Sequence, residues 1–321
     1  MKFRKKMKNK IHGFVVILLC GLFWIGCKGN ERATTPTTGA LPLICDDAVS
    51  NVIQIQKNEF EKRYTQAKID MQLAPASAAI VKLINNEVEC IISSRELDST
   101  ETDFLIRHEI KVFSQKFALD GIAIIVNSEN PIEEMSLASL RELFSGDATY
   151  WSDITDSVRF PYHLNRIQIV SDGRRSGNYR VLHEMVLDKN PLSPNAVVLS
   201  GDSANSVVPK ILDFVASTPG AIGYVSTAWV GKTSADWESR SGKLKVIRVS
   251  GEDFHKAVEP IQGYVYRGDY PLRRVLYIIH RQPYIGLAAG FTAFLTGNDG
   301  QKICLANNLV PGMNPIRLKH E

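Results

Sequence analysis

The sequence predicts an α/β protein divided into two domains, and three observations point to this class. Short apolar segments alternate with amphipathic segments along most of the chain, which is typical of a largely parallel sheet covered by helices on both faces. The composition, 44% hydrophobic and 22% charged, is that of an ordinary globular protein and excludes overall disorder or coiled coil. The 321 residues exceed what one hydrophobic core usually supports, so two domains of roughly 100–150 residues each are expected.

The N-terminus has the layout of a bacterial export signal. Six basic residues lie within the first ten positions and precede the apolar run Ile11–Ile25, which is shorter than the ~20 residues that a transmembrane helix needs. Gly26 places a small residue before Cys27, so residues 1–26 are interpreted as a lipoprotein signal peptide and Cys27 as the lipidated residue. An uncleaved membrane anchor is the alternative. In either case we expect a protein of the cell envelope, periplasmic or attached to the outer membrane.

Residues 27–40 are expected to form a flexible tether. This segment is polar and rich in Thr, Gly and Pro, and it lacks the apolar side chains needed to fold. Cleavage of the signal would also change the charge. The formal net charge is +4, but removing the six basic residues of the signal leaves 32 basic against 34 acidic residues, a net charge of −2. Bulk charge therefore gives no support to a nucleic-acid partner, and none is expected.

The first part of the body alternates between expected strands and helices. Each strand is a short apolar run, and polar residues that can cap a helix follow it. The expected strands are 41–45, 68–73 and 90–93, and the helices are 46–64, 78–85 with Ser77 as its cap, and 99–108. Segment 117–127 is the longest β-like run and shows no helical period.

The second part continues the alternation without an internal repeat. The expected strands are 167–170, 196–199, 221–225, 243–249 and 271–280. The expected helices are 136–144, 176–187, 203–216, 286–295 and 299–307. These elements complete a second α/β set.

The cysteines predict neither a disulfide framework nor a metal site. Without Cys20 and Cys27, three remain, so at least one thiol is unpaired, and no Cys/His cluster accompanies them. Each of Cys45, Cys90 and Cys304 lies in an apolar run, which favours buried free thiols. No cofactor is expected.

Catalytic motifs give no support to an enzyme. The sequence contains no H-E-x-x-H, G-x-S-x-G, P-loop or G-x-G-x-x-G pattern. His183-Glu184 is interpreted as a surface pair on a helix. A hydrolase with Ser176 as nucleophile is disfavoured, because no His or Asp partner has motif-level support. The protein is therefore expected not to be an enzyme.

An anion site is indicated where an expected strand meets the helix that opens at Ser176. The first N–H groups of a helix lack intrahelical partners, and the helix dipole favours negative charge there. Ser176 and Asn178 add side-chain donors, and Gly177 allows an anion to approach the backbone. Arg174 and Arg175 supply positive charge and planar donors. The alternative is an ordinary capped helix with solvated arginines.

Two junctions in the first part resemble this one. Ser77 lies between alanines after an expected strand, and Ser93-Ser94-Arg95 ends another. Three such junctions shared between two α/β sets favour anion binding over coincidence.

Several segments carry a resemblance to a known family. They are Ile91–Leu97, Leu137–Trp151, Ser171–Asn178, Pro219–Val225, Tyr270–Ile278 and Phe294–Pro311. In their order and spacing the chain resembles, from Leu41 to Leu318, the substrate-binding components of bacterial phosphate ABC transporters, in the type II periplasmic-binding-protein superfamily.

The resemblance implies two α/β domains joined by a two-strand hinge, with an anion clamped in the cleft between them. Segments 117–127 and 273–280 correspond to the crossover strands. The first domain would comprise 41–121 plus 271–321 and the second 122–270. Closure would be a hinge motion, stabilised by ligand contacts to both domains.

The site residues carry over only in part. Ser176 and Gly177 match the family's Ser-Gly, whereas Asn178 replaces a Thr. Asp172 stands where the family has an Arg, and Arg174 and Arg175 are the nearest substitutes for it. Ser94 stands where phosphate binders have an Asp that accepts a hydrogen bond from protonated phosphate. The ligand-binding residues suggested by pattern and resemblance are Asp47, Ser77, Ser93, Ser94, Arg95, Arg174, Arg175, Ser176, Gly177 and Asn178. Asp46 or Asp47 would have to supply the missing carboxylate.

The resemblance implies a lipid-anchored binding protein for phosphate or a related oxyanion in ABC-type uptake. Its partners would be inorganic phosphate or a similar oxyanion, an ABC permease and the membrane reached through the lipid, and a monomer is expected. The alternative is an envelope interaction or sensing module with the same fold and a degenerate anion pocket. The altered residues at Ser94, Asp172 and Asn178 motivate that alternative.

Overall fold

The computed structural model describes residues 34–312 apart from 157, 253–255 and 282–284. The predicted signal peptide 1–26, Cys27 and the tether up to residue 33 lie outside the described residues. Among the described residues, no helix has the length and apolar character needed to cross a membrane.

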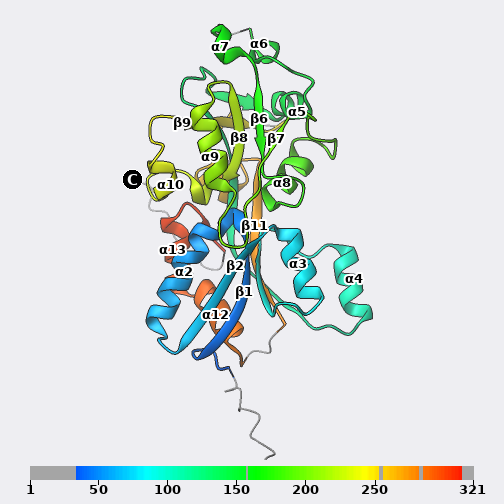
Figure 1. Ribbon diagram of the computed structural model, residues 1–321, viewed down its shortest axis with the longest axis vertical. Helices are drawn as coiled ribbons and strands as arrows, with labels where there is room; N and C mark the ends of the chain where they lie inside the picture. Colours follow the sequence, from blue (N-terminus) through cyan, green and yellow to red (C-terminus); the bar gives the residue numbers. More distant parts are fainter. Residues whose placement is uncertain (1–33, 157, 253–255, 282–284, 313–321) are drawn as a thin grey trace, which may run out of the picture. The chain divides into compact units, whose positions relative to one another are not determined.

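One sheet of ten strands runs through the described residues. These strands are β1 (Gly39–Asp46), β2 (Ala67–Ala74), β3 (Cys90–Ser93), β4 (Phe113–Asn127), β6 (Gln168–Ser171), β7 (Val197–Val198), β8 (Ala221–Ser226), β9 (Leu244–Val246), β11 (Arg273–His280) and β12 (Val310–Pro311). Their order is β2-β1-β3-β11-β4-β8-β6-β7, with β9 and β12 also paired to β4 (Figure 1). The strands joined by helices pair in parallel, as their alternation predicts, whereas β4 and β11 pair antiparallel with their neighbours.

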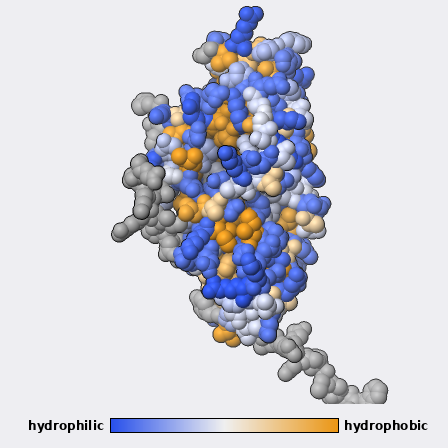
Figure 2. Space-filling model, turned by 90° about the vertical axis from the view of Figure 1, so that its left-hand side faces the viewer, coloured by the Kyte–Doolittle hydropathy of each residue, from blue (hydrophilic) through white to orange (hydrophobic). Residues whose placement is uncertain are grey.

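Helices lie against both faces of the sheet, and Figure 2 shows a mostly hydrophilic surface on one side of the molecule. They are α2 (Ser50–Arg63), α3 (Ala76–Ile84), α4 (Ser99–Arg107), α5 (Leu137–Ser145), α6 (Trp151–Ile154), α7 (Tyr162–Asn165), α8 (Gly177–Met185), α9 (Val208–Ser217), α10 (Ala235–Glu238), α11 (Gln262–Arg267), α12 (Leu287–Thr296) and α13 (Asn298–Ala306). Short 3-10 turns occur at η2 (Asp47–Val49) and η3 (Thr227–Trp229), and β5 (Glu134–Ser136) pairs separately with β10 (Arg248–Ser250).

We call β1, β2, β3, β11 and β4 up to Gly121, with their helices, the β1 half. Strand alternation explains its two cores. Leu43 and Cys45 point to the face covered by α2 and α12, whereas Ile44 points to the face covered by α3. Because both faces are buried, β1 carries an almost continuous apolar run.

We call β6, β7, β8, β9 and β4 from Ile122, with their helices, the β8 half. Here Ile222 and Tyr224 of β8 pack with α5 and α8, whereas Ala221 and Val225 pack with α9. β4 runs through both halves, and Leu272, just before β11, belongs to the core of the β8 half. These are the two places where the chain passes between the halves; the predicted division into domains 41–121 plus 271–321 and 122–270 stays a prediction.

Two local starts differ from the sequence prediction. Ser77 does not cap α3, because the helix already begins at Ala76 after Pro75, which fixes the backbone for a first turn. In addition, Gly39 already pairs with Ala67 in β1, and residues 34–38 have defined backbone contacts. The folded body therefore begins before residue 41, within the segment assigned to the tether.

Two segments of the β8 half also differ. The predicted helix 203–216 begins only at Val208, because the Asp202 carboxylate accepts hydrogen bonds from the backbone N–H groups of Ala204 and Asn205, both at 2.8 Å. The predicted strand 243–249 is divided into β9 and β10, which pair with different partners.

Candidate functional site

The candidate site lies where strand ends of the two halves meet. Asp46 ends β1 and Ser93 ends β3, both in the β1 half. Asp172 directly follows β6 of the β8 half, and Ser176 precedes α8. Because ligands of α/β proteins bind outside the carboxyl ends of parallel strands, this is the place at which a site is expected.

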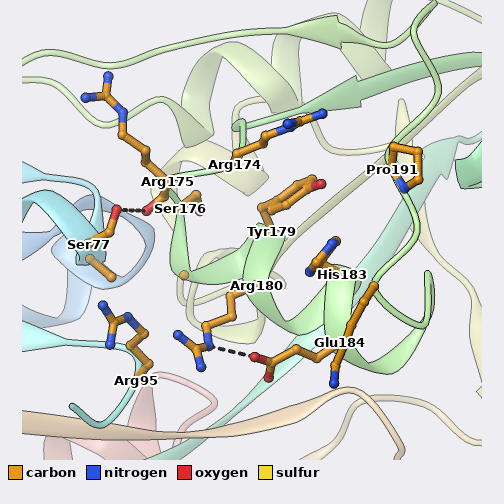
Figure 3. A pocket seen from close by; sticks show the side chains of 13 residues that line it. Ser77, Arg95, Arg174, Arg175, Ser176, Tyr179, Arg180, His183, Glu184 and Pro191 are labelled. Atoms are coloured by element: carbon orange, nitrogen blue, oxygen red, sulfur yellow. Dashed lines mark hydrogen bonds and ion pairs between the residues drawn. The ribbon is translucent and has the colours of Figure 1, made fainter. Parts of the chain in front are cut away.

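A cavity of about 530 Å³ opens beside this junction and is lined by both halves (Figure 3). Ala76, Ser77 and Arg95 line it from the β1 half. The β8 half contributes Arg174, Arg175, Ser176, Gly177, Tyr179, Arg180, His183, Glu184, Lys189 and Pro191. Six of the ten residues suggested by the sequence are thus brought together, whereas Asp47, Ser93, Ser94 and Asn178 are not among the lining residues and are buried nearby.

The start of α8 is occupied by a carboxylate of the chain itself. Ser176 caps the helix, since its hydroxyl oxygen accepts a hydrogen bond from the Asn178 N–H at 3.0 Å. The same hydroxyl donates to Asp172 Oδ2 at 2.5 Å, and Asn178 Nδ2 donates to this oxygen at 2.9 Å. The two side-chain donors expected for an anion therefore bind Asp172, the residue at the position where the resemblance implies Arg.

The two halves touch directly beneath the cavity. Ser94 Oγ donates to Asp46 Oδ2, so a carboxylate stands beside Ser94 although Ser94 itself carries none. A Cβ atom on Gly177 would lie 1.6 Å from Ser94 Oγ and 2.7 Å from Asp46 Oδ2, which only glycine can accommodate. In this arrangement no space for an anion remains between Ser94 and Gly177.

Asp46 and Asp47, which are buried, and Asp172, which is partly buried, form a group that we call the carboxylate cluster. Burial, together with the carboxylates of Asp46 and Asp172, raises the pKa of Asp47 to about 7, although the Val207 N–H partly opposes this. Burial also raises the pKa of Asp172 to about 6, with Asp46 adding to the rise, while hydrogen bonds from Ser176, Tyr224 and Asn178 lower it. No Arg or Lys among the described residues forms an ion pair with these three carboxylates.

The cations around the cavity fall into two groups. Arg95 forms a double hydrogen bond to Glu101, at 2.6 and 2.7 Å, and Arg180 pairs with Glu184 at 2.9 Å. Within the described part of the chain, no carboxylate lies within ion-pair distance of Arg174, Arg175 or Lys189. The positive charge available to a ligand therefore comes from the β8 half, while Ser77 Oγ donates to the Arg175 carbonyl at 3.0 Å.

Several lining residues were missed by the sequence analysis. Tyr179 and His183 stack with ring centroids 5.5 Å apart, and both line the cavity together with Glu184. Their four-residue spacing on α8 was the available signal, because it places both rings on one helix face. The interpretation of His183-Glu184 as a mere surface pair was therefore incomplete.

The residues that line the cavity include no cysteine. Among the described residues, no group of three or more His, Cys, Asp or Glu is placed to hold a metal ion. The prediction for the cysteines is confirmed: Cys45, Cys90 and Cys304 are buried and free. All three belong to the core of the β1 half.

A two-part α/β scaffold with a polar cavity where strand ends meet is suited to binding a small solute. The chain belongs to the PBP superfamily, the family whose model, described as PBP superfamily domain, matches residues 30–299. This is a family of binding proteins, not of enzymes.

Curated relatives are similar over most of the chain. The phosphate-binding protein PstS of Staphylococcus epidermidis is 25% identical over 282 residues, which cover 86% of this chain and 81% of the relative. PstS of Pseudomonas aeruginosa is 21% identical over 287 residues, covering 85% and 83%.

Solved structures confirm the predicted type II fold. A structure from Clostridium perfringens, described as a phosphate ABC transporter substrate-binding protein with bound phosphate, has a TM-score of 0.68 at 21% identity and covers 85% of this chain and 100% of its own. The ABC-type phosphate transport receptor of Vibrio cholerae has a TM-score of 0.62 at 18% identity and covers 84% and 99%.

Proposed function

We propose that this protein binds phosphate or a related oxyanion in the cavity between the β1 and β8 halves and delivers it to an ABC permease. The observation that carries the proposal is a set of cavity-lining cations that have no carboxylate partner among the described residues: Arg174 and Arg175 just before α8, and Lys189 beyond its end. Ser77 and Arg95 line the same cavity from the β1 half. The names of the relatives support the same ligand class. Binding would rest on local donors, because the bulk charge of the mature chain does not attract anions.

The proposed mechanism is closure of the two predicted domains on the ligand. A ligand shifts an open–closed equilibrium only through contacts that differ between the two states. An anion in the cavity would contact Ser77 or Arg95 from the β1 half and Arg174 or Arg175 from the β8 half. These contacts exist together only when the halves are close, so binding favours the closed state.

Calorimetric titration of the purified full-length protein tests this proposal. Phosphate, sulfate and other oxyanions are each added at constant ionic strength. We expect saturable binding of at least one of them at submillimolar concentration. The absence of heat from all of them at millimolar concentration would contradict the proposal.

We further propose that the protein is held at the cell envelope through a lipid on Cys27. The support is the sequence alone: an apolar run followed by Gly26 directly before the cysteine. Expression in a bacterium with labelled palmitate should label the wild type and the Cys20→Ser control. Label in Cys27→Ser would contradict the assignment.

A sensing or interaction module of the envelope is a second candidate, and one observation favours it. Gly177 packs on Ser94 and Asp46, so the halves already touch at the position where the resemblance places an anion. Co-purification of envelope proteins other than a permease, combined with no oxyanion binding, would select this candidate over transport.

A further inference from the structure

The cavity between the halves is large compared with inorganic phosphate. It encloses about 530 Å³, whereas a water molecule occupies ~30 Å³ and the five heavy atoms of phosphate roughly two to three times as much. Sites for small organic ligands typically measure about 300–1,000 Å³. A bare phosphate would therefore leave most of this cavity to water.

The charges of the cavity are separated along its length. Arg174, Arg175 and Lys189 are the cavity-lining cations without a carboxylate partner among the described residues. Figure 3 shows the Arg174 side chain on the side of Tyr179, whereas the Arg175 side chain points the other way. The floor at Gly177 lies against Asp46, beside the rest of the carboxylate cluster. An anionic group is thus attracted to the arginines and repelled from the floor.

One wall of the cavity presents rings and carbon surface rather than charge. Tyr179 and His183 lie side by side on α8, stacked with an interplanar angle of 20°, and Pro191 lies near them (Figure 3). Ala76 adds a small apolar side chain from the β1 half. Aromatic and proline surfaces contact organic groups favourably but contribute little to the binding of a naked oxyanion.

From these observations we infer that the preferred ligand is a phosphate monoester of a small organic alcohol, with its phosphoryl group at Arg174 and its organic part along Tyr179 and His183. This inference rests on the proposed function and names the substrate class of the same site. Inorganic phosphate then binds at the same arginine but more weakly.

The test compares ligands at about pH 8.5, where inorganic phosphate and both esters are mostly dianions. Phenyl phosphate, glycerol 3-phosphate and inorganic phosphate are titrated calorimetrically into the purified full-length protein at one pH and ionic strength, with phenol as the uncharged control. We expect at least one ester to bind about tenfold more tightly than inorganic phosphate and phenol not to bind measurably. Inorganic phosphate binding as tightly as both esters would overturn the inference and leave the proposed function intact. If neither phosphate, sulfate nor an ester binds, the proposed function fails as well.

Variants locate the two parts of the ligand. Arg174→Ala should weaken both the esters and phosphate by a similar factor. His183→Ala should weaken the preferred ester at least about threefold more than phosphate, because only the ester reaches the rings. Arg107→Ala, which removes an exposed arginine of α4 outside the cavity, is the matched control and should change neither affinity. Equal losses of ester and phosphate affinity in His183→Ala would overturn the placement of the organic part.

Discussion

Carboxylates are removed from solvent in two regions of this molecule, and they differ in whether a cation pairs with them. Asp120, in β4 where the chain passes between the halves, accepts hydrogen bonds from Arg274 at 2.8 and 3.0 Å, from Ser226 at 2.8 Å and from Thr227 at 2.9 Å. The carboxylate cluster of Asp46, Asp47 and Asp172 receives hydroxyl and amide donors but no ion pair among the described residues.

The difference indicates different roles for the two regions. At Asp120 a full set of donors compensates the cost of burial, so the carboxylate holds β4, β11 and the start of η3 together. In the cluster the cost is not compensated, and the pKa values of Asp47 and Asp172 rise toward neutrality. Carboxylates with a shifted pKa are typical of functional sites, whereas fully paired ones are typical of structural sites.

The largest loss of stability is expected from removing the cation that pairs with Asp120. Arg274→Met leaves Asp120 buried without its cation and should lower the free energy of unfolding by about 3–5 kcal/mol. Urea denaturation measures this change. The control is Arg248→Ala, because Arg248 pairs with Glu134 at an exposed position and should cost less than about 1 kcal/mol. Equal effects of the two variants would remove the distinction.

A smaller loss is expected where the halves touch. Gly177→Ala places a Cβ atom against Ser94 Oγ, so the hydroxyl and the Asp46 carboxylate must shift. Overpacking of this kind costs about 1–3 kcal/mol. Thermal unfolding of Gly177→Ala and of the double variant Gly177→Ala/Ser94→Gly tests the cause, because removing the Ser94 hydroxymethyl group should restore part of the stability. A double variant no more stable than Gly177→Ala would contradict it.

Binding should depend on the cations of the cavity and on the start of α8. Arg175→Ala and Ser176→Ala are each expected to weaken oxyanion affinity by about 1–3 kcal/mol, because a bound anion loses a charged donor or the cap that orders the helix start. Titration calorimetry measures the change. Unchanged affinity in both variants would place the ligand elsewhere.

The cluster should make stability depend on pH in a gradual way. Because the pKa values of Asp47 and Asp172 are raised in the folded state, this state binds more protons than the unfolded state between about pH 4 and 7. The contribution of the cluster to stability is therefore highest below about pH 4, falls as the pH rises through 6 and 7, and stays low above. Asp172→Asn should be relatively more stable at pH 8 and show a flatter pH dependence in urea denaturation. A steeper dependence in this variant would contradict the assignment.

The sequence predicted those elements whose signals are local. Strand β3 is found at 90–93 as expected, and Ser176 caps α8 because a Ser followed by an amphipathic run is a sufficient signal. The predicted start of α9 was wrong because the Asp202 carboxylate accepts hydrogen bonds from the N–H groups of Ala204 and Asn205. These bonds form a turn in place of the first turn of a helix.

The site was predictable only in part, because its chemistry depends on contacts between distant segments. The pattern around Ser176 located the cavity, but the contact of Ser94 with Asp46 follows from the register of β1 on β3, in which Cys45 lies opposite Ile92. That Ser176 and Asn178 donate to Asp172 depends on the turn between β6 and α8. Residue types alone do not specify either contact.

The three buried thiols can be used to measure local opening of the β1 half, because a thiol reagent reaches them only when their surroundings open. Cys45, Cys90 and Cys304 are each 0% exposed and all lie in the core of the β1 half, while the sequence of the β8 half contains no cysteine. A thiol reagent therefore reacts with the folded body only when the β1 half opens, whatever happens in the β8 half. The rate of modification in the presence and absence of a ligand would separate the motion of one half from that of the other, without introducing any label.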